Sequence, residues 1–340
     1  MKTYISLILA AALLLSLSGC GAPQGSVPEA IPEETAPDAA LPSSVSWQEE
    51  KDGQTLTIQA DVECGDAIPD KMYTLTFDQD ARQRLFDALI EDPADLAHED
   101  EQGRTVGITF DTELHHGSPL GDIYFEDHRK TDWNEKSLDQ EKFWDPGYFS
   151  PMKPGNFQIS SREAAGEMAE FLSGYSCLDY VPARAEAREG ADGAYYIHFS
   201  ATFRDLNILS RDMPGLSGQI RESGMEAFQG TLLLKEADSQ AISDPLTFQQ
   251  ALARLKTDFF ESSYAKNLTI ERILCCYTAM PGDDSWRLSP AWVFLGQETG
   301  GYIDPYGDYH MPDSLPAAYV YDMNDGFLDI LDANHLHDFS

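Results

Sequence analysis

The sequence predicts an α+β fold with two antiparallel-sheet domains, each covered by one or two helices, after a signal peptide and a disordered tether. Three observations lead to this prediction. Apolar residues alternate with polar ones over several short runs, as half-buried strands require. Other runs carry apolar residues every three or four positions behind capping residues, as amphipathic helices do. Residues 1–46 show neither pattern.

The N-terminus has the features of an export signal. An uncharged, mostly apolar run from Ile5 to Leu17 follows Lys2, and it is too short to cross the roughly 30 Å core of a bilayer. It ends in Leu17-Ser18-Gly19-Cys20, which resembles the lipobox of bacterial lipoproteins. The resemblance implies that residues 1–19 are a cleaved signal peptide and that Cys20 is the lipidation site. The lipid would anchor the protein to the outer face of the cell membrane. An ordinary secretory signal, in which Cys20 has no such role, is the alternative.

Residues 20–46 are expected to form a tether between the lipid and the folded part. The segment carries five prolines among Ala, Ser and Glu, and it has no aromatic residue. Such a composition buries too little apolar surface to offset the entropy lost on ordering. In a polyproline conformation the tether would reach roughly 80 Å from the membrane.

The overall composition limits the function classes. A hydrophobic fraction of 42% in 340 residues allows a sizeable core after the tether. The formal net charge of −35 argues against a nucleic-acid partner, because binding to phosphates depends on clustered Lys and Arg. No second apolar run has the length of a transmembrane helix. The lipid on Cys20 is therefore the expected contact with the membrane.

The first predicted domain covers residues 47–158. Residues 55–62 alternate as a half-buried strand, and a second strand is expected around Leu75. A helix follows with Asp78 as its N-cap and a stop at Asp92-Pro93. Two more strands centre on residues 106–110 and 123–125. The order β-β-α-β-β suggests one antiparallel sheet covered by one helix. Periodicity stops from residue 130 to 157, and we place the domain boundary in this aromatic-rich loop.

The second predicted domain covers residues 159–340 and has two helices. Ser160 with Glu163, and Thr247 with Gln250, have the spacing of a capping box. Strands are expected at residues 195–203, 224–234, 270–277, 291–295 and 318–331. The last of these should be a hairpin that turns at residues 324–326, because Asp-Gly favours a tight turn.

The C-terminal half resembles known bacterial proteins. The resemblance rests on the helix at 161–175, the strand at 195–203, the helix after Leu246-Thr247-Phe248, the run Ser289-Pro290-Ala291-Trp292 and the Asp325-Gly326 hairpin. These features resemble uncharacterised lipoproteins of clostridial, Gram-positive bacteria. More distantly, they are similar to YycI/YycH-type extracellular regulators and PepSY-like domains. The resemblance covers roughly residues 160–332. It implies an α+β fold and a non-catalytic, interaction-type role, with no functional residue to carry over.

Catalytic and metal-binding motifs are missing from the sequence. The histidines do not form an HExxH motif, and Asp304, Asp308 and Asp313 lack the spacing of an EF-hand loop. The run Gly215-Leu216-Ser217-Gly218 lacks the second glycine of a nucleophile elbow. We therefore expect no catalytic residue, no metal and no cofactor. A calcium titration would check the three aspartates.

The four cysteines after Cys20 match no zinc or redox spacing. Consecutive side chains of a strand point to opposite faces, so a disulfide between the neighbours Cys275 and Cys276 is not expected. Buried free thiols are the first interpretation. One disulfide between distant members of the set stays open, the set being Cys64, Cys177, Cys275 and Cys276.

Aromatic residues in acidic loops supply the candidate ligand contacts. Such rings offer broad contact areas in peptide and carbohydrate recognition at a small entropy cost. The candidates are Trp133, Trp144, Tyr148, Trp286, Trp292 and Tyr306. Burial in the core is the competing interpretation, because Trp292 and Phe294 alternate as core-facing strand residues do.

The sequence therefore favours a surface-anchored, non-enzymatic lipoprotein. It would act as a binding or regulatory module for a partner protein, a peptide or a cell-wall ligand. The alternative is an extracellular hydrolase that acts on polysaccharide or peptide. A cleft with convergent carboxylates, or a site centred on a histidine, would favour this alternative.

Overall fold

The computed structural model describes residues 41–340 except 66, 113–119, 131–147, 151–157, 188–192, 211–212, 214, 222–223, 263–264, 301, 304–308, 311–313 and 333–340. The predicted signal peptide, Cys20 and most of the predicted tether lie outside the described residues. The strand content is 54%, and the described chain has three α-helices, α2 (Gln79–Leu89), α3 (Ser161–Ser173) and α4 (Phe248–Ser262). This content confirms the predicted α+β class.

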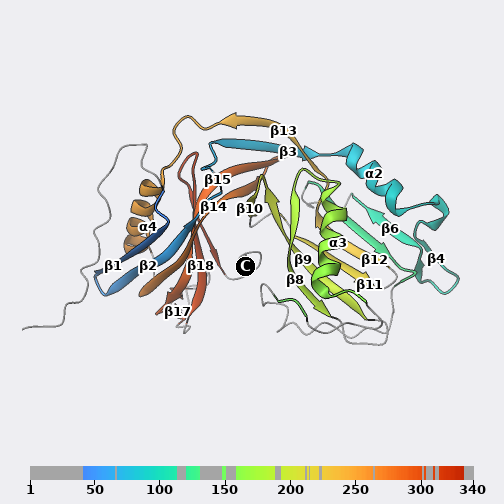
Figure 1. The fold of residues 1–340 in the computed structure, drawn as a ribbon, viewed down its shortest axis with the longest axis horizontal. Helices are drawn as coiled ribbons and strands as arrows, with labels where there is room; N and C mark the ends of the chain where they lie inside the picture. The colour runs from blue at the N-terminus through green and yellow to red at the C-terminus, as the bar shows by residue number, and fades with distance from the viewer. Residues whose placement is uncertain are drawn as a thin grey trace, which may run out of the picture.

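The chain forms an arch of two lobes that long strands join at the top (Figure 1). The left lobe contains α4 and the strands β1 (Ser44–Lys51), β2 (Gln54–Glu63), β14 (Asn267–Pro281), β15 (Trp286–Thr299), β18 (Leu315–Asp322) and β19 (Leu328–Asp332). The right lobe contains α2, α3 and the strands β6 (Ile108–Asp111), β7 (Asp122–Asp127), β8 (Asp179–Ala187), β9 (Ala194–Phe203), β11 (Leu216–Arg221) and β12 (Gly224–Thr231). Between the lobes lie β3 (Lys71–Phe77), β10 (Leu206–Leu209) and β13 (Leu234–Ala241).

Short elements complete the described chain. A single 3-10 turn, η1 (Pro93–Asp95), follows α2 and is capped by Asp92. Two small two-stranded ladders join β4 (His98–Glu99) to β5 (Thr105–Val106) and β16 (Tyr302–Ile303) to β17 (Tyr309–His310).

One 15-stranded sheet of the described chain runs through both lobes. β14 and β15 form its longest antiparallel pair, and β2 lies parallel to β14, with Ile58 beside Ile270. β3 pairs with β13 on one side and β15 on the other. β10 pairs with β14 in parallel and with β9 antiparallel, and so connects the lobes. The right lobe then continues in the order β9, β11, β12, β7, β6.

These pairings cross the predicted domain boundary in the 130–158 loop. β2 and β3 pair with strands of the C-terminal third, and β7 pairs with β12. Apart from the small β4–β5 ladder, the strands of residues 47–158 therefore belong to a sheet shared with the rest of the chain, and the two parallel pairings correct the expectation of purely antiparallel sheets. Periodicity identifies a strand and its buried face. It carries no information about which distant strand completes the hydrogen bonds.

The helices begin where their capping residues predict. The Asp78 carboxylate accepts hydrogen bonds from the N–H groups of Asp80 and Ala81 at 3.1 Å. Both capping boxes are present, with Glu163 bonded to Ser160 and Gln250 bonded to Thr247. Each box satisfies N–H groups that the helix leaves without an intrahelical partner.

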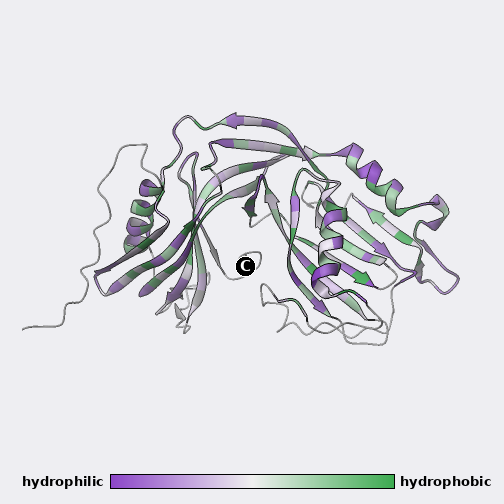
Figure 2. Cartoon of the chain, viewed as in Figure 1, coloured by the Kyte–Doolittle hydropathy of each residue, from purple (hydrophilic) through white to green (hydrophobic). Residues whose placement is uncertain are grey.

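Each lobe has its own hydrophobic core. In the right lobe, α2 and α3 cover one face of the sheet, with Met168 and Leu172 among the buried residues. In the left lobe, α4 packs on β2, β14, β15 and β18, with Phe259 and Trp292 inside. A smaller apolar cluster lies on the opposite face of β14, β15 and β18. Hydrophobic and hydrophilic residues alternate along many of the strands (Figure 2).

The folded part also begins earlier in the chain than the predicted end of the tether at residue 46. β1 begins at Ser44 and pairs with β2 along its whole length. Leu41, Val45 and Trp47 pack against the left-lobe core. Residues 44–46 therefore belong to the folded part, because Val45 and Trp47 cover the edge of that core.

Candidate functional site

The sheet of the right lobe has an apolar face and a polar face. Residues that pair directly across neighbouring strands share a face. The central row faces the core and consists of Ala185, Ile197, Gly218, Phe228, Phe125 and Phe110. Two rows on the other face are polar except for one alanine. One row is Glu186, Tyr196, Gln219, Ala227, Glu126 and Thr109. The other row is Arg184, His198, Ser217, Gln229, Tyr124 and Asp111. We call this surface the polar face.

A buried ion pair belongs to the polar face. Glu226 lies in a bulge of β12, where the pairing with β11 shifts after Gln219. A bulge redirects side chains, and Glu226 joins the polar face although Phe228 points into the core. Its Oε2 accepts hydrogen bonds from Arg221 Nε at 2.7 Å and from Gln219 Nε2 at 2.5 Å. The Arg221 and Glu226 side chains are only 7% and 2% exposed.

A second ion pair lies on β8. Arg184 Nη2 donates to Glu186 Oε1, and both residues are buried. Their direct neighbours on β9 are His198 and Tyr196. A charge removed from water is stable only when it is paired and hydrogen-bonded. The polar face therefore holds two prearranged pairs in which each positive charge is matched by a negative one.

Glu126 forms the third group of contacts. The Tyr124 hydroxyl donates to Glu126 Oε2, and His128 Nδ1 lies 3.4 Å from Glu126 Oε1. The other ring nitrogen, His128 Nε2, is 2.8 Å from Thr109 Oγ1. Burial, together with the bond to Glu126, raises the pKa of Tyr124 above its ordinary value. Tyr124 therefore keeps its proton and acts as a hydrogen-bond donor at neutral pH.

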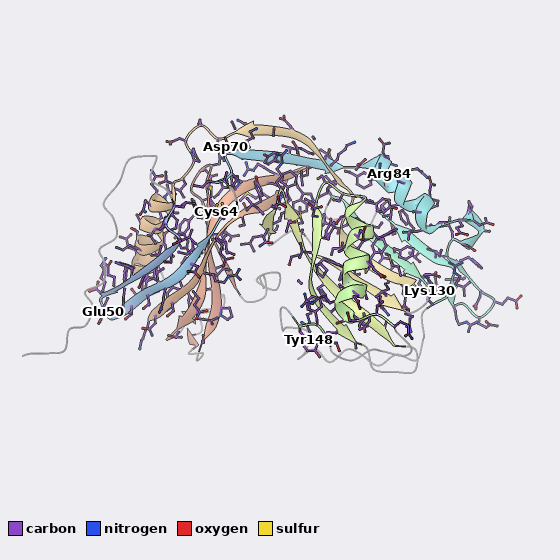
Figure 3. The ribbon with its side chains drawn as sticks, viewed as in Figure 1. Glu50, Cys64, Asp70, Arg84, Lys130 and Tyr148 are labelled. Atoms are coloured by element: carbon purple, nitrogen blue, oxygen red, sulfur yellow. The ribbon has the colours of Figure 1, made fainter. Side chains whose placement is uncertain are left out.

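Tyr148 lies at the lower end of the right lobe (Figure 3), and it is the one aromatic candidate among the described residues that lies beside the polar face. Its carbonyl accepts a hydrogen bond from Ala185 N–H, so the segment from Tyr148 extends the edge of β8. Phe149 packs on the right-lobe core, with the Arg162 guanidinium 3.8 Å from its ring centre. Side chains alternate along an extended segment. Half-buried Tyr148 therefore points to the side of Arg184 and Glu186.

The other aromatic candidates are corrected or lie outside the described residues. Trp286 and Trp292 are fully buried, and their indole N–H groups donate to the carbonyls of Leu120 and Leu246 at 2.7 and 3.0 Å. Both rings are core residues and cannot contact a ligand at the surface, because flanking apolar strands enclose them. Outside the described residues lie Trp133, Trp144, Tyr306, Asp304, Asp308 and Asp313.

A depression on α4 is a second place where charged groups gather. It has a volume of about 450 Å³ and is lined by Ala253, Arg254, Thr257, Asp258 and Gly326. Arg254 Nη1 donates to the Gly326 carbonyl at 2.5 Å, and the Tyr321 hydroxyl donates to Asp258 at 2.9 Å. Both charged groups already hold the last hairpin to the helix. The polar face is therefore the stronger candidate site.

Among the described residues, no group of three or more His, Cys, Asp or Glu residues is arranged to hold a metal ion. None of the helices described is long and apolar enough to cross a membrane.

The sequence contains a signal for the polar face that lies outside the catalytic and metal-binding motifs. Residues with polar side chains recur at every second position in Arg184 and Glu186, in Gln219 and Arg221, and in the run from Tyr124 to His128. A solvated strand face shows the same pattern. Only the pairing of these strands reveals that the residues form continuous rows.

Comparison with known proteins adds little to this geometry. No protein family model and no curated protein matches the chain. The chain is similar to an uncharacterised protein from Eubacterium rectale of known crystal structure, with 14% sequence identity and a TM-score of 0.45. That similarity covers 85% of this chain and 94% of the other.

Proposed function

We propose that the protein is a surface-anchored lipoprotein that binds a peptide, from a partner protein or from the cell wall, on the polar face. The proposal rests on the two polar rows, which run across six neighbouring strands. Each peptide group offers one donor and one acceptor, and the rows present both. Side chains that are already held by internal bonds lose less entropy on binding.

The bonding of the carboxylates favours binding over hydrolysis. A general acid must hold a proton near the reaction pH. Glu226 and Glu186 are bound to Arg221 and Arg184, and an adjacent guanidinium favours the ionised carboxylate. Glu126 accepts a hydrogen bond from Tyr124. These carboxylates are suited to holding donors in place, and hydrolysis of polysaccharide or peptide is kept as the alternative outcome of the test.

The location rests on the lipobox-like run that ends at Cys20. We expect the full chain to incorporate labelled fatty acid and to enter the detergent phase on partition. Cys20→Ala should abolish both, because this sulfur would carry the lipid. A Cys20→Ala protein that stays labelled and detergent-soluble would contradict the anchor.

Binding can be tested with two defined probes, a tetrapeptide library and soluble cell-wall muropeptides. The double variant His198→Ala and Gln229→Ala removes polar groups from one row without breaking an arginine pair. It should bind the selected peptides at least ten-fold more weakly, a loss of about 1.4 kcal/mol. Glu167→Ala, on the exposed side of α3, is the matched control and should bind as the wild type does.

Two results would decide against the proposal. Equal binding by the double variant and the wild type would move the site away from the polar face. Cleaved peptide or glycan products in the same mixtures would support the hydrolase.

A further inference from the structure

We propose that Cys64 and Cys275 are the site of a disulfide that joins β2 to β14, formed by exchange with a small-molecule disulfide. This inference is independent of the peptide-binding proposal. It concerns the left lobe, whereas the polar face belongs to the right lobe.

The register of the two parallel strands places the thiols side by side. Val62 lies beside Ile273, and Glu63 lies beside Leu274. Cys64 directly follows the last residue of β2, and Cys275 follows Leu274 in β14, so the register continued by one residue brings them together. Neighbouring strands are about 4.8 Å apart, within the Cα separation of about 4.4–6.8 Å that a disulfide spans.

The two side chains also share a face of the sheet. Cys275 is a member of the left-lobe core, and Cys64 packs against the same core. Each thiol is close enough to the other to shift its pKa, and Cys64 Sγ also donates to the Ala67 carbonyl at 4.0 Å. Cys276 belongs to the apolar cluster on the opposite face. The structure therefore selects one pair from the several that the sequence left open.

The two thiols differ in accessibility and acidity. Cys64 is half-buried at the end of β2 (Figure 3), whereas Cys275 is buried. The interaction with Cys275 holds the pKa of Cys64 below its ordinary value, and the interaction with Cys64, together with burial, raises the pKa of Cys275. By contrast, burial raises the pKa of Cys177 to about 12. Cys64 is thus the thiol that ionises first and meets an oxidant from solution.

The exchange proceeds in two balanced steps. The Cys64 thiolate attacks one sulfur of the small-molecule disulfide, which breaks its S–S bond and releases one small thiol. Cys275 then gives up its proton and attacks Cys64 Sγ, which releases the second small thiol. Two protein thiols are oxidised to one disulfide, and one external disulfide is reduced to two thiols.

The test uses the full chain and oxidised glutathione as the probe. After incubation, remaining thiols are alkylated, and the protein is digested with trypsin without reductant and analysed by mass spectrometry. Cleavage after Lys51, Lys71, Arg272 and Arg287 gives the peptides 52–71 and 273–287. We expect these peptides to be linked, with the loss of two free thiols. The oxidised protein should also melt at a higher temperature, because the bond closes a loop of about 210 residues.

Three variants assign the bond to its sulfurs. Cys276→Ala should keep the cross-link, and so should Cys177→Ala, the matched control. Cys275→Ala should leave glutathione attached to Cys64, since no second thiol then lies beside Cys64 on the same face of the sheet to release it. If the buried Cys275→Ala variant does not fold, the digests of the wild type and of Cys276→Ala are sufficient to test the proposal. A wild-type protein that keeps glutathione on Cys64 without a cross-link would overturn the proposal. Loss of the cross-link in Cys276→Ala would overturn it as well.

Discussion

Single buried carboxylates in this protein are held by hydrogen bonds from nearby donors. Asp322, at the end of β18, is buried. Its Oδ1 accepts hydrogen bonds from Ser289 Oγ at 2.9 Å and from Asn324 N–H at 2.7 Å. Its carbonyl accepts from Gly326 N–H, and Gly326 has a φ of +72°. Asp322 therefore organises the hairpin turn that the Asp-Gly pair predicted. Burial raises the pKa of its carboxyl group.

Asp322→Asn should change how stability depends on pH. Because the pKa of Asp322 is raised in the folded state, its contribution is fully present below the unfolded pKa of about 3.9 and is lost as the pH rises through the folded pKa. Asparagine does not titrate, so the variant lacks this loss. We expect the melting temperature of the variant, relative to the wild type, to increase as the pH rises from about 3.5 to about 6.5.

The matched control is Asp284→Asn, the same substitution at an exposed residue between β14 and β15. A difference that varies with pH in Asp322→Asn and not in the control assigns the effect to the buried carboxyl group. A variant-minus-wild-type difference for Asp322→Asn that stays constant across the series would show that the carboxyl does not titrate differently in the two states.

At the scale of elements, the sequence predicts those helices and strands whose formation depends on residues close to one another in the chain. The three helices have caps and apolar stripes, and β2, β7 and β9 alternate cleanly. β8, β10, β11 and β13 were not predicted as separate strands. β8 contains Pro182, β11 contains Gly218, and β13 is exposed along nearly all its length. Pairing with neighbours makes these segments strands, because propensity alone does not favour them.

The same limit applies to the candidate site. Of the predicted aromatic contacts, only Tyr148 lies beside the polar face, whereas two tryptophans are core residues. Local sequence gives the face on which a strand residue lies: in β9, His198 alternates with the buried residues Ile197 and Phe199. It does not show that Arg184 of β8 and His198 of β9 are neighbours, because that follows from the register.

A pair of glycine substitutions should have effects of opposite sign. At the bulge between β14 and β15, a Cβ on Gly296 would lie 2.0 Å from the carbonyl oxygen of Thr269. Backbone cannot move away as a flexible side chain does, so Gly296→Ala should lower the free energy of unfolding by about 3 kcal/mol. Gly166, in the middle of α3, has no atom within 4 Å of that position. Gly166→Ala should raise the free energy of unfolding by about 0.5–1 kcal/mol.

Urea denaturation of the two variants and of the wild type measures both changes in the free energy of unfolding. Equal m-values would show that the same two-state transition is compared. A Gly296→Ala protein as stable as the wild type would mean that the two strands do not approach so closely.

At the scale of the whole molecule, the left lobe is built from two distant parts of the chain. β1 and β2 come from residues 44–63, and their neighbours come from residues 246–332. The intervening chain builds most of the right lobe. No local signal predicts such an arrangement, because the pairing of Ile58 with Ile270 depends on the fold of everything between them.

Residues 159–340 expressed alone should not fold cooperatively. In this fragment β14 lacks β2, β12 lacks β7, and β13 and β15 lack β3. The unpaired strand edges and the exposed core residues should give a molten or aggregated product. Circular dichroism and thermal melting can compare this fragment with a control protein of residues 41–340. A sharp unfolding transition for the fragment would contradict this expectation.

The parallel pairing of β2 with β14 also has a consequence for the order in which the protein folds. A chain that is synthesised from its N-terminus presents the β1–β2 hairpin first, and a two-stranded hairpin is only marginally stable in water. Its partner β14 follows about 200 residues later, which at about 5–20 residues per second is a delay of roughly 10–40 s. Many strands of the right lobe pair with strands that are synthesised within that interval. The left lobe therefore closes last, and an interrupted chain leaves the edge of β2 exposed to proteases and to other strands.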